Sequence, residues 1–262
     1  MYTNYYPRSE MDVLAWAPPE EESSLRKWWL GHGSSAFRWV PPGVRVLDIG
    51  CGFGQSLGYH LARGCDVCGV EADENIRRVA EQYGLNVKVG LFDADDYEAN
   101  SFDYVTLDQV IEHVAKPLEL LQSVSSILKP GGVVIVSTPN ARGWGSRLFG
   151  RRWIHWHVPY HQQFFSTNSM KLLAKKTGFD CFSVKTMTNS EWLHYQWLHL
   201  VTYPEAGKPS AFWSPRVLAG KSDRMFIKCF KLIHRLKVNH LVTRVFDIVG
   251  LGDNRVYFLR KS

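Results

Sequence analysis

Residues 44–54 read VRVLDIGCGFG, an apolar run followed by glycines at three alternate positions. The apolar part, Val44–Ile49, predicts a buried strand, and Gln55–Arg63 after the glycines predicts a helix. Glycine lets the backbone turn sharply and approach a ligand closely, and the first N–H groups of a helix have no partner within it. In open α/β sheets, ligands lie at the carboxyl ends of strands. The pattern therefore predicts a binding site for a small polar ligand at this loop.

The spacing of the glycines and of two carboxylates indicates which ligand the loop binds. A dinucleotide-binding fingerprint, G-x-G-x-x-G, requires glycine where this chain has Gln55, so a nicotinamide oxidoreductase is disfavoured. Asp48, two residues before the first glycine, is suited to an ammonium group rather than a pyrophosphate. Glu71 ends the next predicted strand, where a carboxylate can accept hydrogen bonds from two ribose hydroxyls. The predicted cofactor is S-adenosylmethionine, and the structural alternative is a tight glycine turn beside a surface glutamate.

Strands and helices alternate on both sides of this loop. The predicted strands are Val44–Ile49, Asp66–Glu71, Val87–Val89, Phe102–Leu107, Val133–Ser137, Phe179–Met187 and Arg255–Arg260. The predicted helices of the core are Gln55–Arg63, Glu74–Tyr83, Pro117–Leu128 and Ser166–Thr177. Strands that alternate with helices of this length imply right-handed crossovers and a parallel sheet. The expected fold class is α/β, a doubly wound, Rossmann-like sheet.

Four segments are expected along the chain. Residues 1–40 form an N-terminal arm and helix, residues 41–188 the cofactor-binding core, residues 189–250 an aromatic-rich helical cap insertion, and residues 251–262 the last strand of the core sheet. Within the core, residues 141–165 are rich in Gly, Arg, Trp and His, and we expect them to form a long functional loop.

Three blocks of the core resemble the class I S-adenosylmethionine-dependent methyltransferases. They are residues 46–54, residues 101–114 and residues 128–137, in the order that the family has them. The resemblance covers residues 40–188 and implies a sheet of seven strands, mostly parallel, whose last strand is antiparallel. The run Ser137-Thr138-Pro139-Asn140 makes the chain similar to a branch that includes ubiquinone-biosynthesis O-methyltransferases and bacterial surface-glycan methyltransferases.

The resemblance also assigns cofactor contacts by position. It implies that Asp48 and the glycine loop hold the methionine moiety, that Glu71 holds the ribose, and that the end of the fourth strand closes over the cofactor. Phe92 and Asp93 lie where the family places adenine contacts. The complete expected set is Asp48, Gly50, Cys51, Gly52, Gly54, Glu71, Ala72, Phe92, Asp93, Leu107, Asp108 and Gln109.

Histidines are the candidate catalytic residues. Methyl transfer mainly requires that donor and acceptor be aligned away from water, but a hydroxyl acceptor must also lose a proton, commonly to a histidine. His155, His157 and His161 cluster in the loop after the fifth strand, whose carboxyl end is expected beside the methyl group. We hypothesise that His161 or His157 is a general base or a substrate anchor, with His113 as a third candidate. The alternative is that these histidines only pack.

Glu112 and His113 raise the question of a divalent metal ion. Some ubiquinone-pathway relatives bind such an ion through a Glu-x-x-Glu-His run, and the matching run here begins with Gln109. A neutral amide oxygen is a weaker ligand for a hard cation than a carboxylate. We therefore expect no metal, with Glu112 and His113 shaping the floor of the active site, and keep metal binding as the alternative.

Composition restricts the partners. The formal charge of +6 favours anionic partners, such as a phosphate-bearing substrate or a membrane surface. Nucleic acid is not expected, because the basic residues are spread out and the fourth strand is not followed by the Asn/Asp-Pro-Pro-aromatic run of many base methyltransferases. Five cysteines, without a secretory signal or an apolar run long enough to span a bilayer, indicate a cytoplasmic protein.

The segment 224–249 in the insertion has the pattern of a basic amphipathic helix. Apolar residues such as Phe226 and Phe230 recur at spacings of three and four, between Lys228, Lys231 and other cations. Two interpretations follow. The favoured one is a cap helix that buries its apolar face on the core, and the other is a helix that rests on a membrane surface near a lipid-linked acceptor.

The predicted function is S-adenosylmethionine-dependent methyl transfer to an oxygen atom of a small-molecule or glycan acceptor. If the segment 224–249 rests on a membrane, this acceptor would be lipid-linked. The alternatives are a nucleic-acid methyltransferase and a non-catalytic protein that only binds S-adenosylmethionine. Methyl transfer to any acceptor would exclude the non-catalytic alternative. The acceptor depends on the pocket built by residues 141–165 and 186–250, where the family resemblance is thin.

Overall fold

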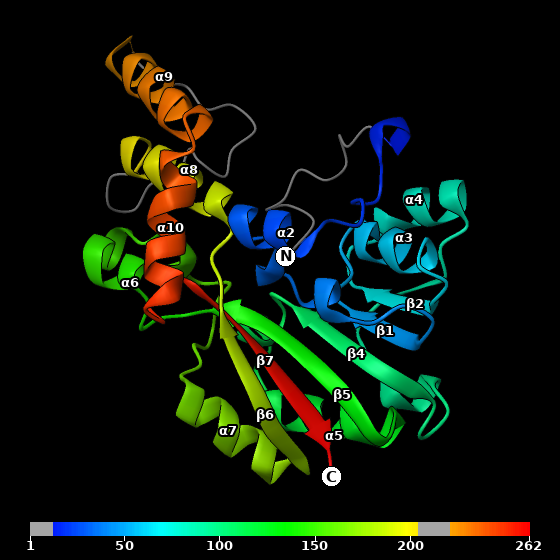
Figure 1. Ribbon diagram of the computed structural model, residues 1–262. Helices are drawn as coiled ribbons and strands as arrows, with labels where there is room; N and C mark the ends of the chain where they lie inside the picture. Colours follow the sequence, from blue (N-terminus) through cyan, green and yellow to red (C-terminus); the bar gives the residue numbers. More distant parts are fainter. Residues whose placement is uncertain (1–12, 204–220) are drawn as a thin grey trace.

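A seven-stranded sheet runs through the computed structural model, which describes residues 13–203 and 221–262 (Figure 1). The strands are β1 (Arg45–Ile49), β2 (Asp66–Glu71), β3 (Val87–Val89), β4 (Phe102–Asp108), β5 (Leu128–Pro139), β6 (Phe179–Thr186) and β7 (Asn254–Lys261). Their order in the sheet is β3-β2-β1-β4-β5-β7-β6. Strands β1 to β5 pair in parallel, and β7 runs antiparallel between β5 and β6. The predicted α/β fold, with its antiparallel last strand, is confirmed.

Helices cover both faces of the sheet. They are α2 (Ser24–Leu30), α3 (Gln55–Leu61), α4 (Ile76–Tyr83), α5 (Pro117–Ile127), α6 (Trp144–Phe149), α7 (Thr167–Lys176), α8 (Ser190–Val201), α9 (Lys221–Arg235) and α10 (Val238–Ile248). Successive residues of a strand point to opposite faces. In β1, Leu47 therefore packs into a core with α5 and α7, whereas Val46 packs into a second core with α3 and α4. These two cores hold the carboxyl ends of the central strands in place.

Local signals in the sequence account for several helix ends. Ser23 caps α2, and its hydroxyl accepts a hydrogen bond from the backbone N–H of Arg26 at 3.3 Å. Ser166 and Ser169 form a reciprocal capping box at the start of α7. Gly84 ends α4 in the left-handed conformation, with φ of 63°. The start of α7 and the end of α4 fall where the sequence predicts them.

Residues 141–165 differ from the single long loop that the sequence predicts, because they contain α6 and short 3-10 turns. Asp253, at the start of the last segment, holds this region together. Its carboxylate accepts hydrogen bonds from the Gly145 N–H at 2.8 Å and from the Trp153 indole at 3.4 Å. The partner that orders the segment lies about a hundred residues away in the chain, so the local composition could not reveal it.

Strand β5 is also longer than expected. It begins at Leu128 and includes residues 129–132, which the sequence predicts to be a turn that ends helix α5. Leu128 pairs with Phe102 of β4, and an irregularity between Phe102 and Tyr104 then brings the two strands back into regular register. Pairing with a neighbouring strand therefore extends this element beyond its apolar run.

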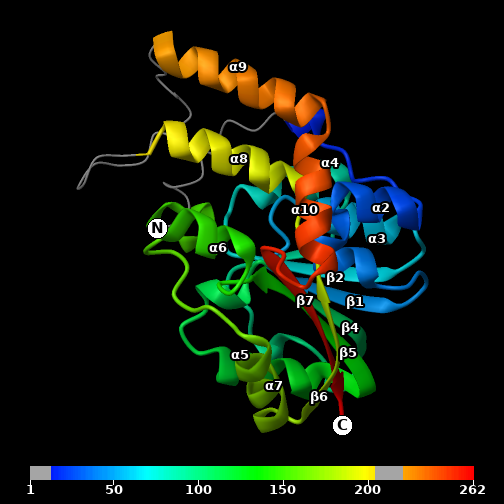
Figure 2. The same ribbon diagram turned by 60° about the vertical axis from the view of Figure 1, so that its left-hand side comes forward.

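The helices of the insertion lie beyond the carboxyl ends of β4 and β5 (Figures 1 and 2). Helix α8 contacts both α9 and α10, and α10 also contacts α2. Arg244 of α10 is buried, pairs with Asp247 at 2.7 Å, and donates to the backbone carbonyls of Trp28 and Thr188. Residues 1–12 of the predicted arm and 204–220 of the predicted insertion are outside the described residues. Among the described residues, no helix combines the length and apolarity needed to cross a bilayer.

Candidate active site

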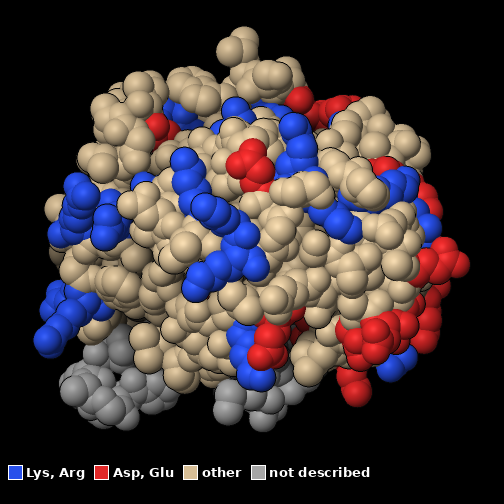
Figure 3. All heavy atoms as spheres, turned by 90° about the horizontal axis from the view of Figure 1, so that it is seen from below, with Lys and Arg blue, Asp and Glu red and all other residues tan. Residues whose placement is uncertain are grey.

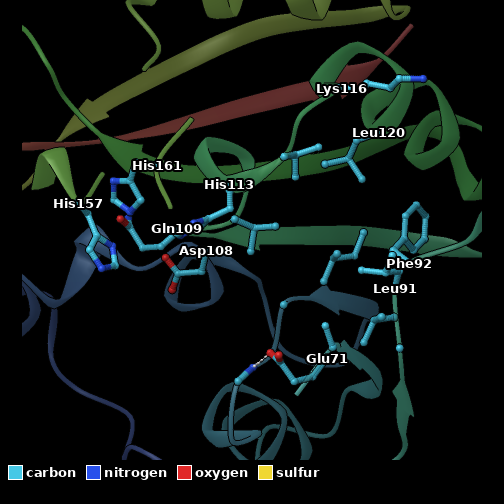
Figure 4. A pocket seen from close by; sticks show the side chains of 18 of the residues that line it. Glu71, Leu91, Phe92, Asp108, Gln109, His113, Lys116, Leu120, His157 and His161 are labelled. Carbon is cyan, nitrogen blue, oxygen red and sulfur yellow. Dashed lines mark hydrogen bonds between the residues drawn. The ribbon is translucent and has the colours of Figure 1, made fainter. Parts of the chain in front are cut away.

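A cavity of 710 Å³ opens at the carboxyl ends of β1, β2 and β4, and Figure 4 shows the side chains that project into it. One end is walled by the glycine loop, the end of β2 and the segment after β3. The other end is walled by histidines of the segment 141–165 and by helix α8. The lining residues are Ile49, Gly50, Gly52, Val70, Glu71, Ala72, Gly90, Leu91, Phe92, Asp108, Gln109, Val110, His113, Val114, Lys116, Glu119, Leu120, Ser123, Ile154, His155, His157, His161 and Trp192.

The glycine loop forms one wall by adopting a conformation that other residues rarely adopt. Gly50, Gly52 and Gly54 have φ of 75°, 57° and 74°, in the left-handed region that favours glycine. A side chain at position 50 would also bring its Cβ within 2.5 Å of Val110 Cγ2, which packs against the loop. The loop therefore needs glycine at position 50 both for its turn and for the close approach of Val110.

Glu71 is held at the end of β2 by two backbone N–H groups. Its Oε2 accepts from Gly52 at 2.8 Å, and its Oε1 accepts from Asp73 at 2.9 Å (Figure 4). The residue is 8% exposed and lines the cavity. Backbone donors fix this carboxylate in place beside the loop, where it can accept hydrogen bonds from neighbouring ligand hydroxyls.

Apolar side chains form the wall next to Glu71. Leu91 and Phe92 follow β3, and Leu120 of α5 lines the cavity in the same region (Figure 4). Phe92 stacks on Tyr97 with ring centroids 6.1 Å apart, which supports the ring from behind. Leu91 is 81% exposed, so a flat ligand in the cavity could lie against its side chain. This wall suits an aromatic base.

The other end of the cavity carries three imidazoles in contact. The His113 and His161 ring centroids are 4.6 Å apart, and those of His157 and His161 are 4.9 Å apart. His113 Nδ1 lies 3.0 Å from the carbonyl oxygen of Tyr160, and His161 Nδ1 lies 2.7 Å from that of His155. A carbonyl accepts only, so Nδ1 carries the proton in both rings and Nε2 carries the lone pair.

Burial keeps these imidazoles neutral. It lowers the pKa of His161 to about 3 and that of His157 to about 4, and each ring disfavours a charge on its neighbours. The pKa of His113 is lowered by the same burial, which outweighs the opposing effect of its bond to the Tyr160 carbonyl. At neutral pH the cluster therefore presents unprotonated nitrogens and no positive charge.

The sequence that builds this site matches the model of a known protein family. The family model described as "Methyltransferase domain" matches residues 12–184, which is most of the chain and includes the whole glycine loop. The chain belongs to this family. The predicted recognition as an S-adenosylmethionine-dependent methyltransferase, and the predicted cofactor, are thereby confirmed.

Curated relatives of this methyltransferase are ubiquinone biosynthesis O-methyltransferases. The one of Cereibacter sphaeroides is 37% identical over 158 residues, which are 55% of this chain and 64% of that protein. The one of Thiobacillus denitrificans is 29% identical over 198 residues, which are 69% of this chain and 84% of that protein. The match to the first relative thus spans less than two thirds of its length.

Solved structures with the same fold include proteins that are named as methyltransferases. A SAM-dependent methyltransferase from Archaeoglobus fulgidus has a TM-score of 0.53 and 18% identity, with coverage of 90% of this chain and 93% of that one. A phosphoethanolamine N-methyltransferase 2 from Haemonchus contortus, in complex with S-adenosyl-L-methionine, has a TM-score of 0.53 and 24% identity, with coverage of 86% and 50%. At these identities the similarity concerns the fold alone.

The methyltransferase cavity includes most residues that the sequence predicts for it. Those that line it are Gly50, Gly52, Glu71, Ala72, Phe92, Asp108, Gln109, His113, His157 and His161. Gln109 has a φ of 57°, and its side-chain amide donates to Ser137 at 2.7 Å and to Asn254 at 2.9 Å. It thereby ties the end of β4 to β5 and β7, beside the histidines.

Asp48 lies behind the glycine loop, next to the cavity but outside its lining. It is 3% exposed and does not line the cavity, and its carboxylate accepts hydrogen bonds from Thr106 at 2.6 Å and from the Ser56 hydroxyl. Burial raises its pKa to about 6 despite these two bonds. Asp48 therefore connects β1 to β4 and to the first turn of α3, and it supports the loop from behind, while its contact with the methionine moiety stays a prediction.

Four other predicted cofactor residues also lie outside the lining of the cavity. Leu107 is fully buried in the core, and Cys51 is buried with its sulfur against Gly69 of β2. Gly54 begins α3, where a Cβ would come within 2.7 Å of Leu85. The Asp93 carboxylate accepts from the Asp95 N–H at 3.1 Å and caps a short turn. These residues position the cavity walls.

Residues that the sequence did not predict also reach the cavity from other elements. They are Ile49, Val70, Gly90, Leu91, Val110, Val114, Lys116, Glu119, Leu120, Ser123, Ile154 and Trp192, while His155 belongs to the predicted histidine cluster. Leu91 could have been found, because it directly precedes the predicted contact Phe92. Trp192 had no such signal, since it comes from the insertion, and only the packing of α8 brings it to the cavity.

A possible metal-ligand set is formed by Glu112, His113 and His161. One ligand atom from each residue lies within 4.8 Å of the others. Glu112 is fully buried, one of its oxygens accepts from Thr138 at 3.0 Å, and the other has no hydrogen-bond partner among the described residues. One carboxylate with two imidazoles is a donor set that suits Zn²⁺ and other transition metals. The sequence did not predict that His161 joins Glu112 and His113, because it lies 48 residues after His113 in the chain.

Proposed function

We propose that this protein transfers the methyl group of S-adenosylmethionine to a hydroxyl oxygen of a small-molecule acceptor. The observation that carries the proposal is that the cofactor cradle and the histidine cluster belong to one cavity. A cavity of 710 Å³ has room for the cofactor and for part of a second molecule beside it. The relatives named ubiquinone biosynthesis O-methyltransferase support transfer to oxygen.

The walls of the cavity suggest how the cofactor is oriented. Glu71 accepts hydrogen bonds from the ribose hydroxyls, and the adenine lies between Leu91, Phe92 and Leu120. The methionine moiety follows the glycine loop, whose backbone at Gly50 and Gly52 faces the cavity. This orientation directs the sulfonium methyl group toward the end of β4 and the histidine cluster.

The histidine cluster supplies the proton acceptor. An imidazole Nε2, held in place by the bond from Nδ1–H to a backbone carbonyl, takes the proton of the acceptor hydroxyl. The acceptor oxygen attacks the methyl carbon in line, the S–C bond breaks, and its electron pair stays on sulfur to give S-adenosylhomocysteine. The protein's part is to align the two molecules and exclude water.

The low pKa of His161 bears on the type of acceptor. Burial lowers the pKa of His161 and so weakens it as a base, and proton transfer to it is easier from a more acidic hydroxyl. A phenol titrates near pH 10, as tyrosine does, whereas an aliphatic alcohol is much less acidic. We therefore favour a phenolic hydroxyl over a glycan hydroxyl. Trp192 and His155, whose ring centroids lie 5.0 Å apart, provide flat surfaces that suit an aromatic acceptor.

A divalent cation would act on the same hydroxyl. Glu112, His113 and His161 would hold it, and it would lower the pKa of a bound hydroxyl as a Lewis acid. In that case His161 orients the acceptor through the ion instead of taking its proton. The carboxylate of Glu112 would then be ionised, although without an ion burial and the nearby Asp108 carboxylate raise its pKa to about 8.

The test is methyl transfer from radiolabelled S-adenosylmethionine to two acceptors, a catechol and a methyl glycoside. We expect transfer to the catechol, and His161→Ala should lower kcat by about 10²-fold or more without changing the affinity for S-adenosylhomocysteine. His194→Ala, a substitution of a histidine outside the cavity lining, is the matched control.

Three results would contradict the proposal in different ways. Transfer to the glycoside alone would replace the phenolic acceptor with a glycan. Wild-type kcat in His161→Ala would remove the catalytic role of that residue. Tight binding of S-adenosylhomocysteine without transfer to any acceptor, including RNA and DNA, would favour a non-catalytic cofactor-binding protein.

A further inference from the structure

Helices α9 and α10 carry a series of exposed apolar side chains, which we call the apolar stripe. Its members are Met225, Cys229 and Leu232 on α9 with Leu236 just after it, and Leu241, Val245 and Ile248 on α10 with Val249 just after it. On each helix they recur at spacings of three and four, so they share one face. Leu232 is 54% exposed and Ile248 is 72% exposed. Isolated exposed leucines are common in proteins, but eight apolar residues in two helical rows are not.

The other face of α9 is the one that packs against the protein. Phe230 of α9 stacks on Trp197 of α8 with ring centroids 5.9 Å apart, and Ile227 and Ile233 are half-buried. The cap-helix interpretation therefore accounts for one face of α9. It leaves the apolar stripe unexplained, since these side chains point away from α8.

Most of the charged side chains beside the stripe are cationic. Lys228, Lys231, Arg235 and Lys237 are exposed. Asp247 is the only acidic residue in the sequence 225–249, and it is buried in its ion pair with Arg244 at 2.7 Å. Cations therefore outnumber the acidic groups near the stripe, which include Asp223 in the first turn of α9 and Glu191 of α8, near His234. On the face seen in Figure 3, by contrast, basic side chains are spread out and acidic ones gather toward one edge.

We propose that the apolar stripe and its cations dock the protein on an anionic lipid surface. Apolar side chains that enter the headgroup region, with Lys and Arg beside them, are the features by which amphipathic helices bind such surfaces. A second copy of this chain is a poorer occupant, because a twofold contact would place the same cationic groups opposite one another. An anionic surface satisfies the apolar and the cationic parts together.

This docking would place the acceptor end of the cavity toward the lipid. Helix α8 lies between the two: its Trp192 lines the cavity, and its Trp197 contacts α9 (Figure 2). An acceptor with an apolar tail could stay in the membrane while its head group reaches the histidines. This part of the inference rests on the proposed function, whereas docking itself does not.

The test is flotation of the full-length protein with vesicles of phosphatidylcholine alone or with phosphatidylglycerol added. We expect binding only to the anionic vesicles. Replacing Lys228, Lys231 and Arg235 by Gln should weaken the partition coefficient by about 100-fold, since each cation near such a surface contributes about 1 kcal/mol. The double variant Leu232→Glu, Ile248→Glu should abolish binding. Leu172→Glu is the matched control, because Leu172 is 57% exposed on α7, outside the stripe.

Methyl transfer to a water-soluble acceptor separates docking from the proposed function. If both proposals hold, the double variant loses vesicle binding and keeps this activity. Absence of binding by the wild-type protein, or equal loss of binding in Leu172→Glu, would overturn docking. A dimer that the double variant converts to monomers, with no vesicle binding by either form, would assign the stripe to a second copy. Docking without transfer would contradict only the proposed function.

Discussion

At the residue scale, Glu71 does two things with one carboxylate. It orders the glycine loop through the Gly52 N–H, and it faces the cavity where the ribose is expected. The first role is internal to the protein and the second needs a ligand. Because the carboxylate is 8% exposed and already oriented, the ligand's hydroxyls would meet an acceptor that needs no rearrangement.

We predict that Glu71→Gln weakens cofactor binding. The amide loses the negative charge and one acceptor, and a hydrogen bond to a charged group contributes about 1.5–3 kcal/mol. The dissociation constant of S-adenosylhomocysteine, measured by calorimetry, should rise by about 10–100-fold. Glu74→Gln, an exposed glutamate three residues on, is the control. An unchanged dissociation constant in Glu71→Gln would show that Glu71 does not contact the ribose.

Also at the residue scale, Glu112, His113 and His161 form a possible metal-binding site. If it holds a transition metal, Co²⁺ added to the protein should produce a visible absorption band that saturates at one ion per chain. We expect His161→Ala to lose the band and His194→Ala to keep it. A wild-type titration without any band would mean that these three side chains serve only as polar groups of the cavity.

At the element scale, the segment 141–165 depends on a carboxylate from another part of the chain. Asp253 is 7% exposed, and burial raises its pKa to about 7 although two N–H groups donate to it. The folded protein therefore favours the protonated acid, whereas the unfolded chain ionises near pH 4. It follows that Asp253 contributes stability below about pH 4, and that this contribution is lost as the pH rises toward 7.

We predict that Asp253→Asn makes stability less dependent on pH. The amide keeps an oxygen to accept the Gly145 N–H and has no charge to bury. The free energy of unfolding of the wild-type protein should fall relative to that of the variant between pH 4 and pH 7, as measured by urea denaturation. The control is Asp180→Asn on the exposed side of β6. Parallel pH curves for wild type and Asp253→Asn would contradict the assignment.

At the scale of the whole molecule, the cavity is assembled from segments far apart in the chain. The glycine loop, the end of β2, α5, the segment 141–165 and α8 all contribute to its walls. A ligand that contacts all of these segments should stabilise the fold as one unit, because it binds the folded chain and not the unfolded one.

We predict that S-adenosylhomocysteine raises the Tm of the protein. At 100 times its dissociation constant the ligand adds about 2.7 kcal/mol, which corresponds to roughly 5 °C or more for a chain of this size. Adenosine at the same concentration is the control, because it lacks the amino-acid part that the glycine loop is expected to hold. An equal shift with adenosine would mean that this loop adds little to binding.

The sequence alone was sufficient for the parts of this protein that depend on neighbouring residues. The strand period of the apolar runs predicts the sheet, and the three glycines predict the turn of the loop. Glu71 at the end of its strand, together with the loop, predicts the cofactor, because the topology of such sheets places ligands at strand ends.

The tertiary structure decided the rest. Asp48 turns inward because Thr106, 58 residues away, donates to it, and His161 meets His113 only because the segment 141–165 folds back over the end of β4. The apolar stripe likewise depends on tertiary packing, because α8 covers one face of α9 and leaves the other exposed. A helical pattern specifies which residues share a face but not which face stays exposed.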